Sequence, residues 1–253
     1  MTWKKNKPDM EQTMKSIVIS GDDLTFKYAK KTVLNSLSFS FQRGCIIGLL
    51  GENGAGKTTL FDLICGSLTP TSGELLITVE ADDIAYLPQV VTFPPALRIS
   101  EVMEMMACFQ GLTAVQSSLC LNRLWPKAMH RRYEEIKEHR SGICSYGEKR
   151  WLATAAMLAL CRKSLFILDE PTAGVDVQYR YLIWQLIKEM KNIGCTIIVS
   201  SHILDEIGAN TDYFYFLQKS GMQRFNGMQD FLTRYQSSSP DEAFIKATVL
   251  EEN

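Results

Sequence analysis

The sequence of 253 residues has no excess of positive or negative charge, no paired-cysteine pattern and no long apolar run. Its 27 lysines and arginines nearly balance 28 aspartates and glutamates, and the formal net charge of −1 disfavours general binding to nucleic acid. The seven cysteines include no Cys-x-x-Cys pair, which favours reduced thiols of a cytosolic protein over disulfides or a cysteine metal site. No segment reaches the roughly 18 apolar residues of a membrane span, so we expect a partner to supply any membrane part.

The residues that are present are typical of one α/β domain. Hydrophobic residues make up 46% of the chain, which is enough for a core. Residues 1–15 are polar and non-periodic and predict a flexible N-terminal tail, whereas residues 16–253 are expected to form one domain. Runs at 16–20, 23–28 and 37–41 predict strands, and the expected fold includes an antiparallel β subdomain.

The second half of the chain alternates strands with helices. Apolar strands at 164–168 and 195–200 flank a helical pattern at 178–193, which predicts a mostly parallel sheet covered on both faces. Apolar residues at helical spacing over about residues 90–150 predict an inserted helical subdomain. A mixed-sign run at 130–140 is expected to be a solvated helix face rather than a docking patch.

A glycine-rich segment with one lysine is the most informative motif. It follows the apolar run Cys45–Leu50, precedes a helical stretch and fits Gly-x-x-x-x-Gly-Lys-[Ser/Thr], so a chance glycine-rich turn is disfavoured. Its backbone N–H groups can surround a polyphosphate at the start of the helix. Lys57 is expected to reach the β- and γ-phosphates, and Thr58 to ligate Mg²⁺. The segment predicted to bind a nucleoside triphosphate comprises Gly51, Glu52, Asn53, Gly54, Ala55, Gly56, Lys57, Thr58 and Thr59.

Two carboxylates and a histidine follow buried strands further along the chain. Asp169 and Glu170 stand at the end of the strand at 164–168, where open α/β sheets present their ligand sites. We expect Asp169 to hold Mg²⁺ through water and Glu170 to act as the general base on the attacking water. His202 follows the strand at 195–200 and either contacts the γ-phosphate or is a plain surface histidine.

These motifs together resemble the ATP-binding subunit of ABC transporters over about Ile17–Thr248. The resemblance implies a P-loop NTPase core with ATP and Mg²⁺ as cofactors. It implies that Gln89 senses Mg²⁺ and couples to the membrane domain, and that Tyr28 stacks on adenine. It also implies that Ala173–Asp176 crosses a dimer interface and that His202 is the family's switch histidine.

The signature of that family, Leu-Ser-Gly-Gly-Gln, is altered here to Cys144-Ser145-Tyr146-Gly147-Glu148. The resemblance implies that Ser145 and Gly147, which are kept, meet the γ-phosphate bound by an opposite subunit. A tyrosine at the third position requires negative φ there, and a carboxylate at the fifth repels phosphate if it points inward. The altered signature therefore bears on the rate of hydrolysis, whereas the prediction of ATP binding depends on the phosphate loop.

The function that we expect is ATP-powered transport of an unknown substrate. Because Glu170, Gln89 and His202 are all present, the chain is expected to be an active ATPase. The resemblance implies a separate permease on the cytoplasmic side of the cell membrane and a second ATP-binding subunit, giving a head-to-tail homodimer. The segment Pro240–Thr248 is similar to the closing segment of export-type subunits, which favours export.

Two other functions stay open at this point. One is a soluble ABC-type ATPase that serves as an assembly or regulatory factor, and the other is an unrelated P-loop switch, which the signature and His202 disfavour. Around Phe93, exposed apolar residues either pack under their own loop or grip a coupling helix of the permease.

Overall fold

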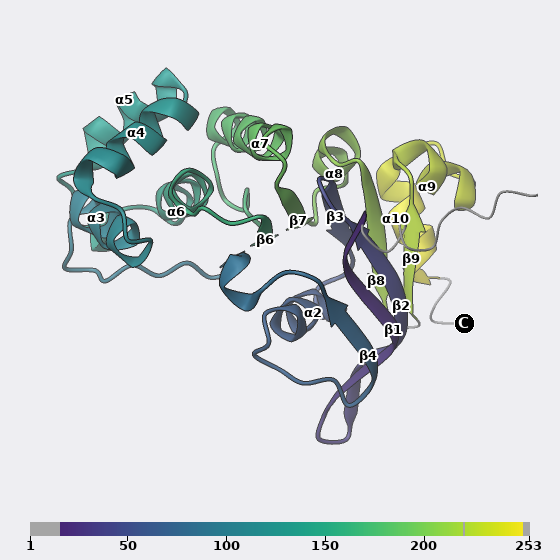
Figure 1. Cartoon of the computed structure of the whole chain (residues 1–253). Helices are drawn as coiled ribbons and strands as arrows, with labels where there is room; N and C mark the ends of the chain where they lie inside the picture. The colour runs from purple at the N-terminus through teal and green to yellow at the C-terminus, as the bar shows by residue number, and fades with distance from the viewer. Residues whose placement is uncertain (1–15, 220, 250–253) are drawn as a thin grey trace, which may run out of the picture.

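The computed structural model describes residues 16–219 and 221–249. Residues 1–15, predicted to be a tail, lie outside this range. The centre of the fold is a six-stranded sheet with the order β5-β6-β7-β3-β8-β9, in which every pair is parallel except β8 with β9 (Figure 1). Its strands are β3 (Ile46–Leu50), β5 (Ile84–Leu87), β6 (Leu165–Asp169), β7 (Thr196–Ser200), β8 (Tyr213–Gln218) and β9 (Gly221–Phe225). The predicted mostly parallel sheet is confirmed.

A second, antiparallel sheet has the order β2-β1-β4 and confirms the predicted β subdomain. Its strands are β1 (Ile17–Tyr28), β2 (Lys31–Gln42) and β4 (Ser72–Ile77). The prediction of two separate strands at 16–20 and 23–28 was wrong, because β1 runs through both. A shift of register between Gly21 and Leu24, with Asp23 at φ 50°, absorbs the turn-like residues as a bulge.

The helices divide between the two faces of the central sheet. The helix α2 (Lys57–Ile64) lies on the face of the antiparallel sheet, and the others belong to the opposite side or to its extension (Figure 1). These are α3 (Ile99–Phe109), α4 (Ala114–Leu124), α5 (Lys127–Ile136), α6 (Tyr146–Leu160), α7 (Val177–Asn192), α8 (Leu204–Asn210), α9 (Met228–Arg234) and α10 (Pro240–Val249), with short 3₁₀ turns at Ala81–Asp83 and Ser141–Ile143.

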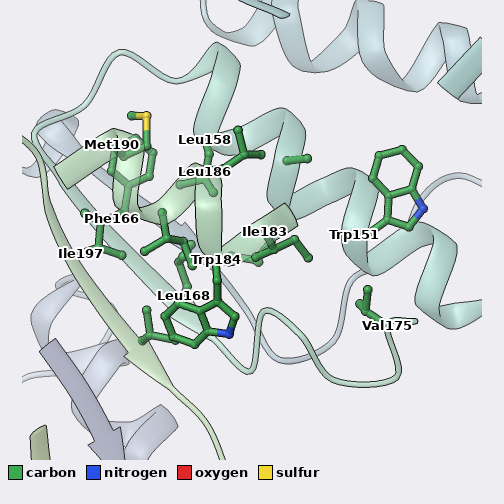
Figure 2. Packing of buried hydrophobic residues seen from close by; sticks show 14 of the residues in the cluster. Trp151, Leu158, Phe166, Leu168, Val175, Ile183, Trp184, Leu186, Met190 and Ile197 are labelled. Atoms are coloured by element: carbon green, nitrogen blue, oxygen red, sulfur yellow. The ribbon is translucent and has the colours of Figure 1, made fainter. Parts of the chain in front are cut away.

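Alternate residues of each central strand belong to two different cores. In β6, Phe166 and Leu168 pack with α6 and α7, whereas Leu165 and Ile167 pack with α2 and the antiparallel sheet. Figure 2 shows the first core, where Trp184 and other side chains of α7 cover the strands. A strand buried on both faces needs a continuous apolar run, which is why the sequence 165–168 has no polar residue.

The helices α3, α4 and α5 occupy the region in which helical spacing was found. The mixed-sign run is largely exposed and forms ion pairs on the surface, such as Lys137–Glu134 at 2.7 Å, as expected for a solvated face. Phe93 is partly buried and packs against the first core. Within residues 16–219 and 221–249, we find no helix with the length and apolarity needed to cross a membrane.

Candidate nucleotide site

The phosphate-binding segment forms the turn between β3 and α2, as its motif predicts. Gly56 caps α2 at φ 104°, in the left-handed region, and a Cβ atom there would lie 2.5 Å from a methyl of Leu34. The Lys57 ammonium donates to the loop carbonyls of Gly51 (2.7 Å) and Glu52 (3.0 Å). Burial lowers the pKa of Lys57, although Glu170, Asp169 and Glu52 act in the opposite direction. The loop therefore holds a buried cation that gains from an incoming anion.

A cavity of about 320 Å³, named here the phosphate-loop cavity, collects most of the predicted site. Tyr28 borders it with half of its surface exposed, as a ring that stacks on a base requires. Lys31 and Val33 also line it, although nothing in the motifs pointed to them. The predicted residues on its wall are Tyr28, Asn53, Gly54, Gly56, Lys57, Thr58, Thr59, Gln89, Asp169 and Glu170.

Three predicted residues of the loop lie elsewhere. Gly51 and Glu52 line an adjoining cavity of about 430 Å³, together with His202 and Phe244. Ala55 is buried in the second core beneath the loop. Their backbone groups belong to the turn, but none of the three lines the phosphate-loop cavity.

Two of the three predicted metal ligands are in contact at the end of β6, and the third lines the same cavity. The Thr58 hydroxyl donates to Asp169 Oδ2 at 2.9 Å, and Gln89 lines the same cavity. Hydroxyl, carboxylate and amide oxygens are ligands suited to Mg²⁺. Over the residues that the structure describes, no group of three or more His, Cys, Asp or Glu side chains gathers as a metal site. The donor set thus fits a Mg²⁺ ion held by few protein ligands and by substrate phosphates.

Glu170 is fixed on three sides. Its N–H donates to the Ser200 hydroxyl at 3.0 Å, its carbonyl accepts from Arg150 Nε at 3.0 Å, and its Oε2 lies 2.8 Å from Nδ1 of His202. The residue adopts φ 54°, a conformation that costs energy for any side chain and is retained where surroundings over-determine it. A buried carboxylate held beside the phosphate loop is suited to orient or deprotonate a water.

Arg150 was not predicted from the sequence, and it holds the backbone of the site from the buried side. The side chain is fully buried in α6, and its guanidinium donates to the carbonyls of Pro88 (2.6 Å), Gln89 (3.2 Å), Asp169 and Glu170. Burial lowers its pKa, and Tyr146 and nearby carboxylates oppose this. A single arginine at the start of the apolar run 151–160 was the signal that could have revealed it.

The signature segment lies outside the phosphate-loop cavity. Ser145 and Gly147 line a separate cavity of about 400 Å³, called the signature cavity, together with Gly174 and Asp176. A Cβ atom on Gly147 would overlap the Gly174 carbonyl, so this close approach requires glycine. Within one chain, the two predicted halves of the nucleotide site are therefore not brought together.

The structure explains both unusual side chains of the signature. Tyr146 begins α6, so its backbone is helical and needs no glycine. Glu148 is the third helical residue and closes a capping box: its Oε2 accepts from Ser145 N at 2.8 Å, and its N–H donates to Ser145 Oγ at 3.1 Å. Arg132 also pairs with it. Although burial acts the other way, these contacts lower the pKa of Glu148.

Comparisons with known proteins agree with this geometry. Residues 34–173 match the family model described as ABC transporter. Protein McbF of Escherichia coli is 37% identical over 92% of this chain and 95% of its own length. Nod factor export ATP-binding protein I of Ralstonia nicotianae is 31% identical over 75% of this chain, which spans 60% of that relative. The doxorubicin resistance ATP-binding protein DrrA of Mycobacterium tuberculosis is 31% identical over 78% of this chain and 61% of its own length.

Solved structures show the same fold. The structure described as an ATP binding subunit of an ABC transporter superposes with a TM-score of 0.77 at 25% identity, over 90% of this chain and 98% of the other. A nucleotide-free ATP-binding cassette gives a TM-score of 0.69 at 17% identity, over 90% and 98% of the two chains, and supports the fold alone.

Proposed function

The chain belongs to the ABC transporter family of ATP-binding proteins, and from that premise we propose that two copies of it form a head-to-tail ATP sandwich. As a member of this family it binds and hydrolyses ATP, and this ATPase activity powers transport through a separate permease. In the proposed dimer, the signature cavity of one copy closes over the phosphate-loop cavity of the other. Binding of ATP and its hydrolysis would then shift the population between closed and open dimers.

The single observation that carries the dimer is the separation of the two cavities. Ser145 and Gly147 border the signature cavity, whereas Lys57 and Thr58 border the phosphate-loop cavity. Ser145 and Tyr146 are exposed, so a second copy can reach them. A second copy supplies the missing half of each site with no further component.

The proposed roles follow from the positions of the side chains. Lys57 neutralises the terminal phosphates, and Tyr28 stacks on the base. Mg²⁺ would be held by Thr58, Gln89 and Asp169, and when bound it would neutralise charge on the β- and γ-phosphates. Glu170 accepts the proton of the attacking water, and His202 steadies that carboxylate and approaches the γ-phosphate.

A homodimer can be tested by blocking hydrolysis. The Glu170→Gln variant with ATP and Mg²⁺ is expected to double its mass in gel filtration with light scattering. Lys57→Ala in that background weakens nucleotide binding and should leave monomers at ATP concentrations that saturate the single variant. Ser145→Arg in the same background should also leave monomers, although it still binds ATP through its intact phosphate loop. If Glu170→Gln stays monomeric at high concentration without another subunit, the homodimer is wrong.

The proposed location of the chain at a membrane is based on the named relatives. We place the chain at the cytoplasmic face of a membrane through its permease, and the names of the Nod factor export and doxorubicin resistance relatives favour export. The helical region of about residues 90–150 would form the subdomain that meets the permease. Cell fractionation separates this from a soluble assembly or regulatory factor: the chain should sediment with membranes only when the permease is co-expressed.

A further inference from the structure

Tyr146 connects three segments of the nucleotide site within one chain. Its hydroxyl donates to the Gln89 carbonyl at 3.1 Å. Its ring lies against Gly174, where an added Cβ atom would be 2.9 Å from Cδ1 of the tyrosine. It directly follows Ser145, the N-cap of α6. The residue therefore touches the wall of the phosphate-loop cavity and belongs to the segment that lines the signature cavity.

The Gln89 carbonyl is held by α6. It accepts from Tyr146 Oη at 3.1 Å and from Arg150 Nη1 at 3.2 Å, and both donors come from the first two turns of that helix. After Gln89 the chain passes through Val90, which is 67% exposed, and packs against the first core again at Val91. The two donors therefore hold the residue that directly precedes this exposed position.

The two donors differ in their exposure and in the segments that they adjoin. Arg150 is buried and also holds the end of β6, so it follows the rigid core. Tyr146 is 45% exposed and adjoins Ser145, so it follows the signature segment. A displacement of that segment toward a phosphate on a second copy would move the tyrosine hydroxyl relative to Gln89.

We propose that Tyr146 is a positioning residue that holds Gln89 in the phosphate-loop cavity and couples it to the signature segment of the same chain. Engagement of the signature segment by the nucleotide of a second copy then changes the placement of Gln89 at the chain's own nucleotide. The inference rests on the proposed function of Gln89 and of the dimer. The tyrosine at the third signature position thereby takes a role that a glycine, with no side chain, cannot perform.

The test uses Tyr146→Phe in the full chain, which removes the hydroxyl and keeps the ring on Gly174. Hydrogen exchange of peptides spanning residues 88–97, measured without nucleotide, is expected to accelerate about five-fold, the equivalent of one ordinary hydrogen bond. The kcat for ATP hydrolysis is expected to fall about five-fold while KM changes less than about two-fold. Tyr181→Phe, at an exposed tyrosine on α7, is the matched control and should change neither quantity.

A double-mutant cycle with Gln89→Ala shows whether the tyrosine acts through Gln89. In the Gln89→Ala background, Tyr146→Phe should cause no further loss of kcat. Fully additive losses, or unchanged exchange in residues 88–97, would overturn the inference. If Gln89→Ala alone leaves kcat intact, the proposed role of Gln89 fails instead, and the exchange measurement still decides whether Tyr146 holds this segment.

Discussion

Nδ1 of His202 lies 2.8 Å from Oε2 of Glu170, and the two side chains differ sharply in exposure. The glutamate side chain is 6% exposed and the histidine side chain 61% exposed. The buried carboxylate is thus oriented by a group that also faces the space above the phosphate loop. The contact links the end of β6 to the residues that follow β7.

Removal of the His202 side chain should lower the rate of ATP hydrolysis more than the affinity for ATP. His202→Ala is expected to lower kcat about 100-fold, the lower end of what positioned acid–base groups contribute, because Glu170 loses its orienting partner. The Kd for ATP should change little, since Lys57 and the loop remain. Phosphate release and nucleotide titration measure the two quantities. His139→Ala, at an exposed histidine, is the control, and an equal loss there would contradict this role.

The lowered pKa of Lys57 predicts how ATP affinity depends on pH. A triphosphate binds the charged ammonium, so affinity should decrease as pH rises through the pKa of Lys57 in the free chain. Because burial lowers that pKa from its ordinary value of 10.5, the decrease begins at a lower pH than for an exposed lysine. Fluorescent-nucleotide titration across alkaline pH measures it.

Lys57→Ala serves as the control for that titration. It should weaken ATP binding about 100-fold, as expected for loss of strong charge-assisted hydrogen bonds, and should flatten the alkaline decrease. In the free wild-type chain, the same lowered pKa makes stability rise with pH through the folded-state value, because the unfolded chain still binds the proton. An alkaline decrease that persists in Lys57→Ala would assign it to another group.

Arg150 should matter for stability as well as for hydrolysis. Arg150→Met leaves the carbonyls of Pro88, Gln89, Asp169 and Glu170 without this donor, and should lower the free energy of unfolding by about 3 kcal/mol. Arg150→Lys keeps the charge but not the fork of donors, so an intermediate loss is expected. Urea denaturation measures both. Arg123→Met, at an exposed position on α4, should have little effect, and similar losses at both sites would refute the assignment.

The acceptor oxygen of Glu148 should account for about half of its contribution to stability, and its charge for the rest. Glu148→Gln preserves the capping box but loses the ion pair with Arg132, so it is expected to cost about 0.5 kcal/mol, whereas Glu148→Ala should cost about 1 kcal/mol. Thermal unfolding compares them. Because the folded-state pKa of Glu148 lies below 4.5, its stabilisation is present above that pH and is lost as pH falls through the lowered value. ATP hydrolysis that increases strongly in Glu148→Gln would show that the carboxylate does repel phosphate.

The sequence predicts the parts of the fold that depend on local chemistry. The phosphate loop and the strand before Asp169 are set by spacing and continuous apolarity, and both are found where expected. The division of 17–28 into two strands failed because Gly21-Asp22-Asp23 has the composition of a turn. Pairing with both β2 and β4 keeps that segment extended, and a local pattern contains no information on those two partners.

Contacts between distant segments are the part that the sequence does not predict. Arg150 and Gln89 are 61 positions apart, and only the packing of α6 against β5 brings them into contact. The same holds for the 32 positions between Glu170 and His202, which parallel pairing of β6 and β7 brings together. The motifs therefore predict which groups react, whereas the residues that hold those groups in place emerge only from the tertiary structure.

Placing the two cavities apart on one chain has a genetic consequence. In a head-to-tail pair, each site combines the phosphate loop of one copy with the signature segment of the other. A chain with an inactive loop and a chain with an inactive signature segment would together assemble one wholly intact site, and both defects would fall in the second. If two copies pair in the proposed way, two defective alleles expressed in the same cell should therefore complement each other, whereas either allele alone should leave both sites impaired.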